Sequence, residues 1–174
     1  MIKKNNIILI GFMGAGKTTL GRWISQNVNM QYIDTDDYIE DAEGTTINDI
    51  FAKNGEEYFR DLETRTLELL CERAEGSVIS AGGGMPVRKE NRDFMKRLGT
   101  VVYLRAGEEE LARRLAGDDK RPMLAGSDLR QRIHELMKKR EGAYLDAADL
   151  IIDTYGKTMD MLYNEIEDGI LNNI

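Results

Sequence analysis

Short apolar runs alternate along the chain with longer stretches in which apolar residues recur at helical spacing. Five runs are short and rich in β-branched residues, which favours buried strands over helices; they are Ile7–Ile10, Met30–Ile33, Ser77–Ser80, Thr100–Leu104 and Leu150–Ile152. Helical spacing marks the segments 17–28, 46–53, 56–74, 88–97, 108–115, 128–145 and 158–171. This alternation predicts an α/β fold with a central parallel five-stranded sheet and helices on both faces.

Composition narrows the class of protein. The chain has 174 residues, 41% hydrophobic and 32% charged, which predicts a single folded domain over residues 1–174. No apolar run approaches the roughly 18 residues of a membrane-spanning helix, and the run at Ile7–Ile10 is too short for a secretory signal. A single cysteine and a single histidine exclude an intramolecular disulfide and a zinc cluster. The net charge of −7 argues against nucleic-acid binding, so we expect a cytoplasmic protein with neither nucleic-acid nor membrane partners.

A phosphate-binding loop follows the first predicted strand. Residues 11–18 read Gly-Phe-Met-Gly-Ala-Gly-Lys-Thr and match the pattern G-x-x-x-x-G-K-[ST] between a strand and a helix. Glycines let successive backbone N–H groups point at phosphate oxygens, and Lys17 adds a full positive charge. The Thr18 hydroxyl is a hard oxygen ligand suited to Mg²⁺. The loop predicts that the protein binds a nucleoside triphosphate.

Acidic residues follow the second strand. Asp34 and Asp36 stand two residues apart, so on an extended segment they share one face. One can then reach a metal-bound water and the other a substrate hydroxyl. Helix capping is the alternative, but it accounts for only one of the acids.

Two further features carry candidate chemistry. The triplet Gly82, Gly83 and Gly84 at the end of the third strand permits close approach of a ligand to the backbone, or is a flexible turn. Glu63 lies one helical turn beyond Arg60 and is placed to hold its guanidinium, although such pairs are commonly surface bridges.

Arg140 shares a helix face with apolar residues. Ile133, Met137, Arg140 and Tyr144 follow the spacing of one face, and no acid of this segment lies on it. A bound carboxylate or phosphate would supply the missing partner, unless the side chain extends to solvent.

The polar segment 116–127 is typical of a mobile lid that carries Arg121 towards the triphosphate, or of a charged loop.

Together these motifs resemble the shikimate kinase family over nearly the whole chain. The shared stretches are Gly-Phe-Met-Gly-Ala-Gly-Lys-Thr-Thr-Leu-Gly (11–21), Asp-Thr-Asp (34–36), Ile-x-x-Ile-Phe (47–51), Gly-Glu-x-x-Phe-Arg-x-x-Glu (55–63), the glycine triplet, Arg-Pro-x-Leu (121–124), and Arg140 followed by Tyr144. Family members usually carry Arg-x-Pro-x-Tyr where this chain has Gly142, and glycine costs about 1 kcal/mol of helix propensity relative to alanine.

The resemblance implies a three-layer P-loop kinase fold with a substrate-binding segment at about 34–63 and a lid at about 116–127. It implies transfer of the ATP γ-phosphate to the 3-hydroxyl of shikimate in chorismate biosynthesis, with Mg²⁺ as cofactor and ATP and shikimate as partners. The implied nucleotide contacts are Gly14, Ala15, Gly16, Lys17, Thr18, Thr19 and Arg121, and the implied metal contacts are Thr18 and, through water, Asp34.

The same resemblance implies the acceptor site. Its shikimate contacts are Asp36, Arg60, Gly82, Gly83, Gly84 and Arg140, with Phe51 and Phe59 as walls of the ring site. The implied catalytic residues are Asp36, Lys17 and Arg121, with Asp36 orienting the hydroxyl or accepting its proton. We expect a monomer.

Other functions are compatible with the same sequence. A kinase of another small hydroxy acid, such as gluconate, is possible on the same scaffold, whereas a nucleoside-monophosphate kinase needs a base-recognition pocket that the sequence does not reveal. A non-catalytic ATP-binding module is the third class; an acceptor carboxylate such as Asp36 would be superfluous in it.

Overall fold

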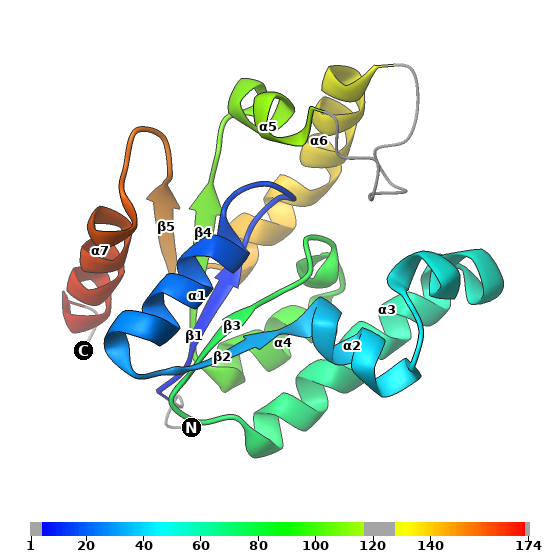
Figure 1. The fold of residues 1–174 in the computed structure, drawn as a ribbon, viewed down its shortest axis with the longest axis horizontal. Helices are drawn as coiled ribbons and strands as arrows, with labels where there is room; N and C mark the ends of the chain where they lie inside the picture. Colours follow the sequence, from blue (N-terminus) through cyan, green and yellow to red (C-terminus); the bar gives the residue numbers. More distant parts are fainter. Residues whose placement is uncertain (1–4, 117–127, 173–174) are drawn as a thin grey trace.

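A parallel sheet forms the centre of the molecule (Figure 1). The computed structural model describes residues 5–116 and 128–172. The strands are β1 (Ile7–Ile10), β2 (Gln31–Asp34), β3 (Ser77–Ser80), β4 (Thr100–Arg105) and β5 (Leu150–Asp153). They lie in the order β2-β3-β1-β4-β5, and every pairing is parallel. The predicted parallel five-stranded sheet is confirmed.

Helices cover both faces of the sheet. They are α1 (Lys17–Val28), α2 (Thr35–Glu43), α3 (Ile47–Arg73), α4 (Lys89–Leu98), α5 (Glu108–Leu115), α6 (Leu129–Ala147) and α7 (Met159–Asn172), with a short 3₁₀ helix, η1, at Met85–Val87. Helices α1 and α7 pack on one face, and α4 and α6 on the other, with α3 against α4 (Figure 1). Among the helices of the described residues, none has a stretch apolar and long enough to pass through a bilayer.

Two separate apolar clusters stabilise the fold. The main cluster surrounds the sheet, and β1, whose four residues are all buried, lies at its centre. The smaller cluster joins α2 to α3 through Ile39, Ile50, Phe59 and Leu62. Residues of the predicted substrate-binding segment therefore have a core of their own, beside the main one.

Two local features differ from the sequence-based expectation. The predicted helices 46–53 and 56–74 are joined in α3, with Gly55 in a non-helical conformation (φ 85°, ψ 174°) between them. Helix α2 was not predicted, because its mainly acidic and polar sequence offers only Tyr38 and Ile39 as large apolar residues. Helix α6 continues through Gly142, so Arg140 and Tyr144 stay on one buried face.

Asn6 links four segments at the amino edge of the sheet. Its Nδ2 donates to the backbone oxygens of Ala74 (3.2 Å) and Leu98 (2.8 Å), and its Oδ1 accepts from the N–H of Ser77 (2.9 Å). The residue is 2% exposed, so water does not replace these partners readily. Asn6 thereby joins the ends of α3 and α4 to the first residues of β1 and β3.

Asn6→Ala is expected to destabilise the protein by about 3 kcal/mol, because it leaves buried backbone groups without hydrogen bonds. Urea unfolding measures this free energy. Asn27→Ala is the matched control, since Asn27 makes its bond to Trp23 on the exposed side of α1 and should change stability by less than about 0.5 kcal/mol. A loss as small as that of the control would show that the Asn6 bonds contribute little.

Candidate active site

A cavity of about 400 Å³ opens at the carboxyl edge of the sheet, where β1, β2 and β3 end. This is the edge at which parallel α/β sheets bind ligands. The predicted site residues that line it are Gly14, Gly16, Lys17, Thr18, Thr19, Asp34, Asp36, Gly82 and Gly83. Residues from the phosphate loop and from the two neighbouring strands therefore meet in one space, as predicted.

The phosphate loop curls between β1 and α1. Gly14 (φ 78°) and Gly16 (φ 99°) adopt left-handed conformations that other residues rarely take. Lys17 lies across the loop, and its Nζ donates to the backbone oxygens of Gly11 (2.8 Å) and Phe12 (3.0 Å). Ala15 is buried, and its N–H donates to the backbone oxygen of Phe12 (3.1 Å), so this N–H stabilises the loop itself.

Both carboxylate oxygens of Asp34 accept hydrogen bonds. Its Oδ1 caps α2 by accepting from the N–H of Asp36 (3.1 Å). Its Oδ2 accepts from the hydroxyls of Thr18 (3.3 Å) and Tyr32 (2.8 Å). Burial, followed by the bond to Asp34, raises the pKa of Tyr32 to about 12, so this phenol keeps its proton.

The donor set around Thr18 fits Mg²⁺. A hydroxyl and a carboxylate, both hard oxygen ligands, lie side by side on the cavity wall next to the phosphate loop. Within the described residues, no group of three His, Cys, Asp or Glu side chains is placed to hold a metal by itself. The ligands present therefore suit an ion held largely by phosphate and water.

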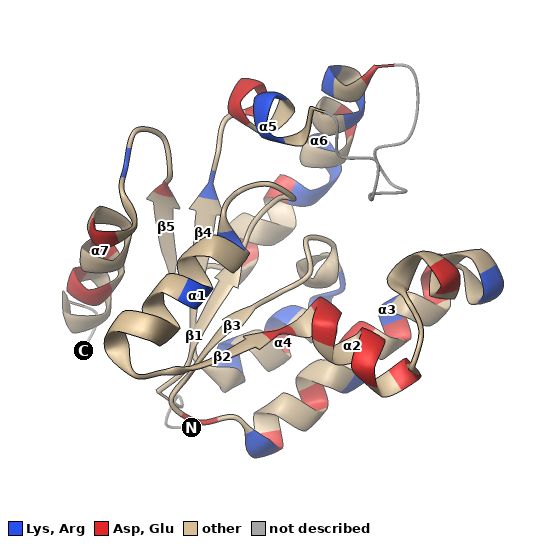
Figure 2. Ribbon diagram, viewed as in Figure 1, with Lys and Arg blue, Asp and Glu red and all other residues tan. Residues whose placement is uncertain are grey.

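The geometry of the acidic segment corrects one premise of the sequence analysis. Asp34 and Asp36 were expected on one face of an extended segment, but β2 ends at Asp34 and α2 starts at Thr35. Helix capping fixes Asp34, whereas Asp36 lies in the first turn of α2, and both still line the cavity. Acidic residues recur along α2 (Figure 2).

The glycine triplet brings the acids and the guanidinium close to the backbone. A Cβ on Gly82 would lie 2.7 Å from Asp36 Oδ1, and one on Gly84 would lie 2.6 Å from Arg60 Nη2. The N–H of Gly82 donates to Thr35 Oγ1 (2.9 Å), which anchors the triplet to α2. Side chains at Gly82 and Gly84 would displace the charged groups, so close packing favours glycine at these two positions, whereas a Cβ on Gly83 would make only ordinary contacts.

Arg60 is held by two acids of its own helix. Its Nη1 donates to Glu63 (2.7 Å) and its Nη2 to Glu56 (2.9 Å). The exposed fractions of the Arg60 and Glu63 side chains are 11% and 1%, so their pair is buried and the predicted support of Arg60 by Glu63 is present. Burial raises the pKa of Glu63 to about 7, against the opposing effect of Arg60.

Arg140 is buried on the predicted face of α6. Ile133, Met137 and Tyr144 are buried with it, and its guanidinium carbon lies 5.9 Å from the centroid of the Phe12 ring. Tyr144 donates to the backbone oxygen of Gly83 (2.5 Å), and burial raises the pKa of this phenol to about 12. Arg140 does not extend to solvent, since only 5% of the residue is exposed.

Some predicted residues lie away from the cavity wall or outside the described residues. Phe51 and Phe59 pack together with ring centroids 4.9 Å apart, in the small cluster behind Arg60. The described lining of the cavity contains neither of these rings nor the two arginines. Arg121 and residues 117–127 of the predicted lid lie outside the described residues.

Sequence reasoning missed several contributors. Arg114 of α5 lines the cavity and donates to the backbone oxygen of Gly14 (3.0 Å). Met159, at the start of α7, lines the cavity as well, and Glu56 binds Arg60. The spacing of Glu56 four residues before Arg60 was a usable signal, whereas the position of Arg114 over the loop depends on tertiary packing.

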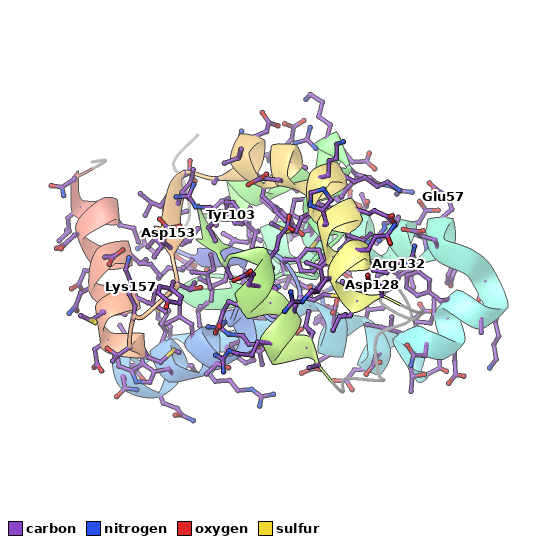
Figure 3. All side chains as sticks on the ribbon, turned by 90° about the horizontal axis from the view of Figure 1, so that it is seen from above. Glu57, Tyr103, Asp128, Arg132, Asp153 and Lys157 are labelled. Carbon is purple, nitrogen blue, oxygen red and sulfur yellow. The ribbon has the colours of Figure 1, made fainter. Side chains whose placement is uncertain are left out.

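Lys157 does not reach this cavity. It pairs with Glu165 of α7 (2.7 Å), and Figure 3 shows it at the opposite end of the molecule from Glu57. His134 is exposed beside Glu108, as expected of a surface residue. Cys71 packs against the main core and contacts the backbone oxygen of Phe94.

Sequence comparisons agree on one family. Residues 13–171 match the family model described as shikimate kinase. The chain is 42% identical over 173 residues to the shikimate kinase of Histophilus somni, covering 99% of this chain and 98% of that protein. It is 42% identical to that of Geobacter metallireducens, covering 92% and 89% of the two chains.

Solved structures agree as well. Shikimate kinase from Acinetobacter baumannii in complex with shikimate superposes with a TM-score of 0.90 at 38% identity, covering 97% of this chain and 93% of that one. The enzyme from Aquifex aeolicus gives 0.83 at 36% identity, covering 97% of each chain. A gluconokinase from Sinorhizobium meliloti gives only 0.55 at 15% identity, over 97% of this chain and 92% of that one, which is a likeness of fold alone.

The buried Glu63 makes stability depend on pH. In the folded chain, the Glu63 carboxyl keeps its proton up to about pH 7, because its pKa is raised to that value. In the unfolded chain it releases the proton near its ordinary pKa of 4.5, so the unfolded state binds fewer protons between these two pH values. The free energy of unfolding should therefore fall as pH rises through this window. At about 1.4 kcal/mol per pKa unit, the effect approaches about 3 kcal/mol.

Urea unfolding of Glu63→Gln between about pH 5 and pH 8 tests this contribution. The variant should gain stability relative to wild type as pH rises, because glutamine resembles the protonated acid at every pH. Glu72→Gln, an exposed position on the same helix, should follow wild type. A difference between Glu63→Gln and wild type that does not change with pH would contradict the raised pKa.

Proposed function

The chain belongs to the shikimate kinase family, and we propose that it transfers the γ-phosphoryl group of ATP to the 3-hydroxyl of shikimate. The products are shikimate 3-phosphate and ADP, in the biosynthesis of chorismate and the aromatic amino acids. Family membership and the shikimate bound to the Acinetobacter baumannii enzyme support this acceptor.

One observation carries the proposal: the phosphate loop and the carboxylate of Asp36 line the same cavity. A phosphate donor bound by the loop and a hydroxyl bound by Asp36 would therefore meet without a large rearrangement. Phosphoryl transfer depends mainly on such positioning and on neutralisation of charge. A module that only binds ATP has no use for this second group.

The nucleotide would lie along the loop and the start of α1. Backbone N–H groups of Gly14, Gly16, Lys17, Thr18 and Thr19 would supply donors for phosphate oxygens, with Ala15 beside them bonded to Phe12, and the positive end of α1 favours the negative charge. Lys17 already lies over the loop and would exchange its backbone acceptors for phosphate oxygens. We assign Arg121 to the lid side of the triphosphate, by its place in the family motif.

Thr18 and Asp34 would hold Mg²⁺, the threonine directly and the aspartate through water. The ion supplies charge neutralisation on the phosphates when it is bound. The chain's own part is to keep the hydroxyl and carboxylate oxygens together, 3.3 Å apart in the structure.

The acceptor carboxylate would be bound by the two buried arginines. Arg60 and Arg140 are 9% and 5% exposed, so an anion that reaches them is itself withdrawn from water, where charge-assisted bonds are strong. Glu56 and Glu63 keep Arg60 in place, and Tyr144, on the same buried face of α6 as Arg140, donates to the backbone oxygen of Gly83. Phe51 and Phe59 would support the ring from the small cluster.

Asp36 would accept a hydrogen bond from the 3-hydroxyl. In the transfer, the acceptor oxygen bonds to the γ-phosphorus, the bond from that phosphorus to the β–γ bridging oxygen breaks, and ADP leaves with that electron pair. The hydroxyl proton passes to the Asp36 carboxylate as the new bond forms. The position of Asp36 on the cavity wall, against Gly82, supports this role.

Both parts of the proposed site come from one chain, so we propose that a monomer in the cytoplasm carries out the reaction. The segment at about 34–63 binds the acceptor within the single domain. Gluconate is not favoured, because the likeness to a gluconokinase is one of fold alone.

Purified protein with Mg-ATP should release ADP when shikimate is added and show no comparable turnover with gluconate or AMP. Coupled detection of ADP measures the rate, and phosphorus NMR of the product locates the ester at the 3-position. Turnover with gluconate but not with shikimate would contradict the proposal and identify gluconate as the acceptor. Tight ATP binding without turnover on any acceptor would instead favour a regulatory module.

Asp36→Asn should lower kcat with shikimate by on the order of 10³-fold, because the amide cannot accept the proton. Affinity for ADP should stay within about twofold, since the nucleotide contacts are elsewhere. Asp37→Asn changes the neighbouring, exposed acid and serves as the control. Near-normal turnover of Asp36→Asn would remove this residue from the reaction.

A further inference from the structure

The carboxylate of Asp34 has a partner that neither the motifs nor the family resemblance assigns. The hydroxyl of Tyr32 donates to Asp34 Oδ2 at 2.8 Å, a shorter bond than the one from Thr18 at 3.3 Å. Tyr32 and Asp34 stand two residues apart on β2, so their side chains lie on the same side of the strand. One carboxylate oxygen thus accepts two hydroxyl groups.

Tyr32 itself is held in place by α1. A Cβ on Gly21 would lie 2.6 Å from the ring carbon Cε2 of Tyr32, so the ring occupies space that only glycine leaves open. The guanidinium carbon of Arg22 lies 5.7 Å from the ring centroid and adds a cation–π contact. The aromatic ring is therefore fixed on the helix that follows the phosphate loop.

This arrangement sets the position of the Asp34 carboxylate relative to Thr18. Oδ1 is fixed by the N–H of Asp36, and Oδ2 is fixed by Tyr32, which is anchored to the same helix that carries Thr18. Without the phenol, Thr18 alone would restrain Oδ2 through the longer bond. The groups beyond a metal's direct ligands orient those ligands and commonly change metal affinity by about 10–100-fold when removed.

We propose that Tyr32 is a positioning residue for the Mg²⁺–nucleotide complex: docked on Gly21, its hydroxyl holds the Asp34 carboxylate beside Thr18 and so strengthens Mg²⁺-dependent nucleotide binding. The proposal rests on the proposed function for the place of the metal, and it adds a residue to that site. A role confined to packing β2 on α1 is the alternative, and it requires only the ring.

Tyr32→Phe separates the two roles, because it keeps the ring on Gly21 and removes only the hydroxyl. The readout is ADP binding by calorimetry, at increasing Mg²⁺ concentration and in EDTA. The Mg²⁺ midpoint is the Mg²⁺ concentration at which the enhancement of ADP binding is half-maximal. In Tyr32→Phe this midpoint should rise by about fivefold or more relative to wild type, whereas ADP affinity in EDTA should stay within about twofold. Tyr163→Phe is the matched control, since it removes a phenol that donates to Glu167 within α7.

A double-mutant cycle assigns the effect to Asp34. If Tyr32 acts through this carboxylate, Tyr32→Phe should not change the Mg²⁺ midpoint further in an Asp34→Asn background. An unchanged or lowered midpoint in Tyr32→Phe would overturn the proposal, as would an equal loss of ADP affinity in EDTA. Because ADP binding needs no acceptor, failure of shikimate turnover in wild type would leave this test intact.

Discussion

The alignment of three strand ends is the constraint on which the site depends. In the parallel sheet β3 lies between β1 and β2, and Ser80 of β3 is in register with both Leu9 and Asp34. The phosphate loop, the start of α2 and the glycine triplet therefore leave the sheet at one level. An antiparallel pairing would send at least one of these connections to the opposite edge. The register of the strands therefore decides which loops meet at the site, and the side chains act within that arrangement.

Charge is distributed unevenly around that edge. The proposed nucleotide side offers backbone N–H groups, a helix terminus and Lys17, all of which suit phosphate. On the proposed acceptor side, Glu56 and Glu63 bind the Arg60 guanidinium, and Asp36 lies against Gly82, where desolvation makes each unpaired charge costly. Such a cluster would hold the guanidinium of Arg60 in place for an anionic ligand. The two sides of the proposed site would thus bind anions by different physical means.

Much of this arrangement follows from local pattern. The five strands, the phosphate loop and the buried face of α6 were predictable because apolar periodicity and glycine spacing are local signals. Helix α2 was missed because its stability comes from packing Ile39 on Ile50 and Phe59, residues distant in sequence. The positions of Tyr32 and Arg114 depend on how α1 and α5 pack, and nothing in their local sequence reveals it.

The burial of the Arg60–Glu63 pair has a consequence for ionic strength. Mobile ions screen exposed charges over about 8 Å at physiological salt, but they do not enter a pair whose side chains are 11% and 1% exposed. The Lys89–Asp93 pair on the surface, with side chains 78% and 59% exposed, has no such protection. A salt concentration high enough to screen the surface pairs therefore leaves the electrostatic interaction between Arg60 and Glu63 largely unchanged. Charge pairs on the exterior of the protein are sensitive to salt, whereas this interior pair is resistant to it.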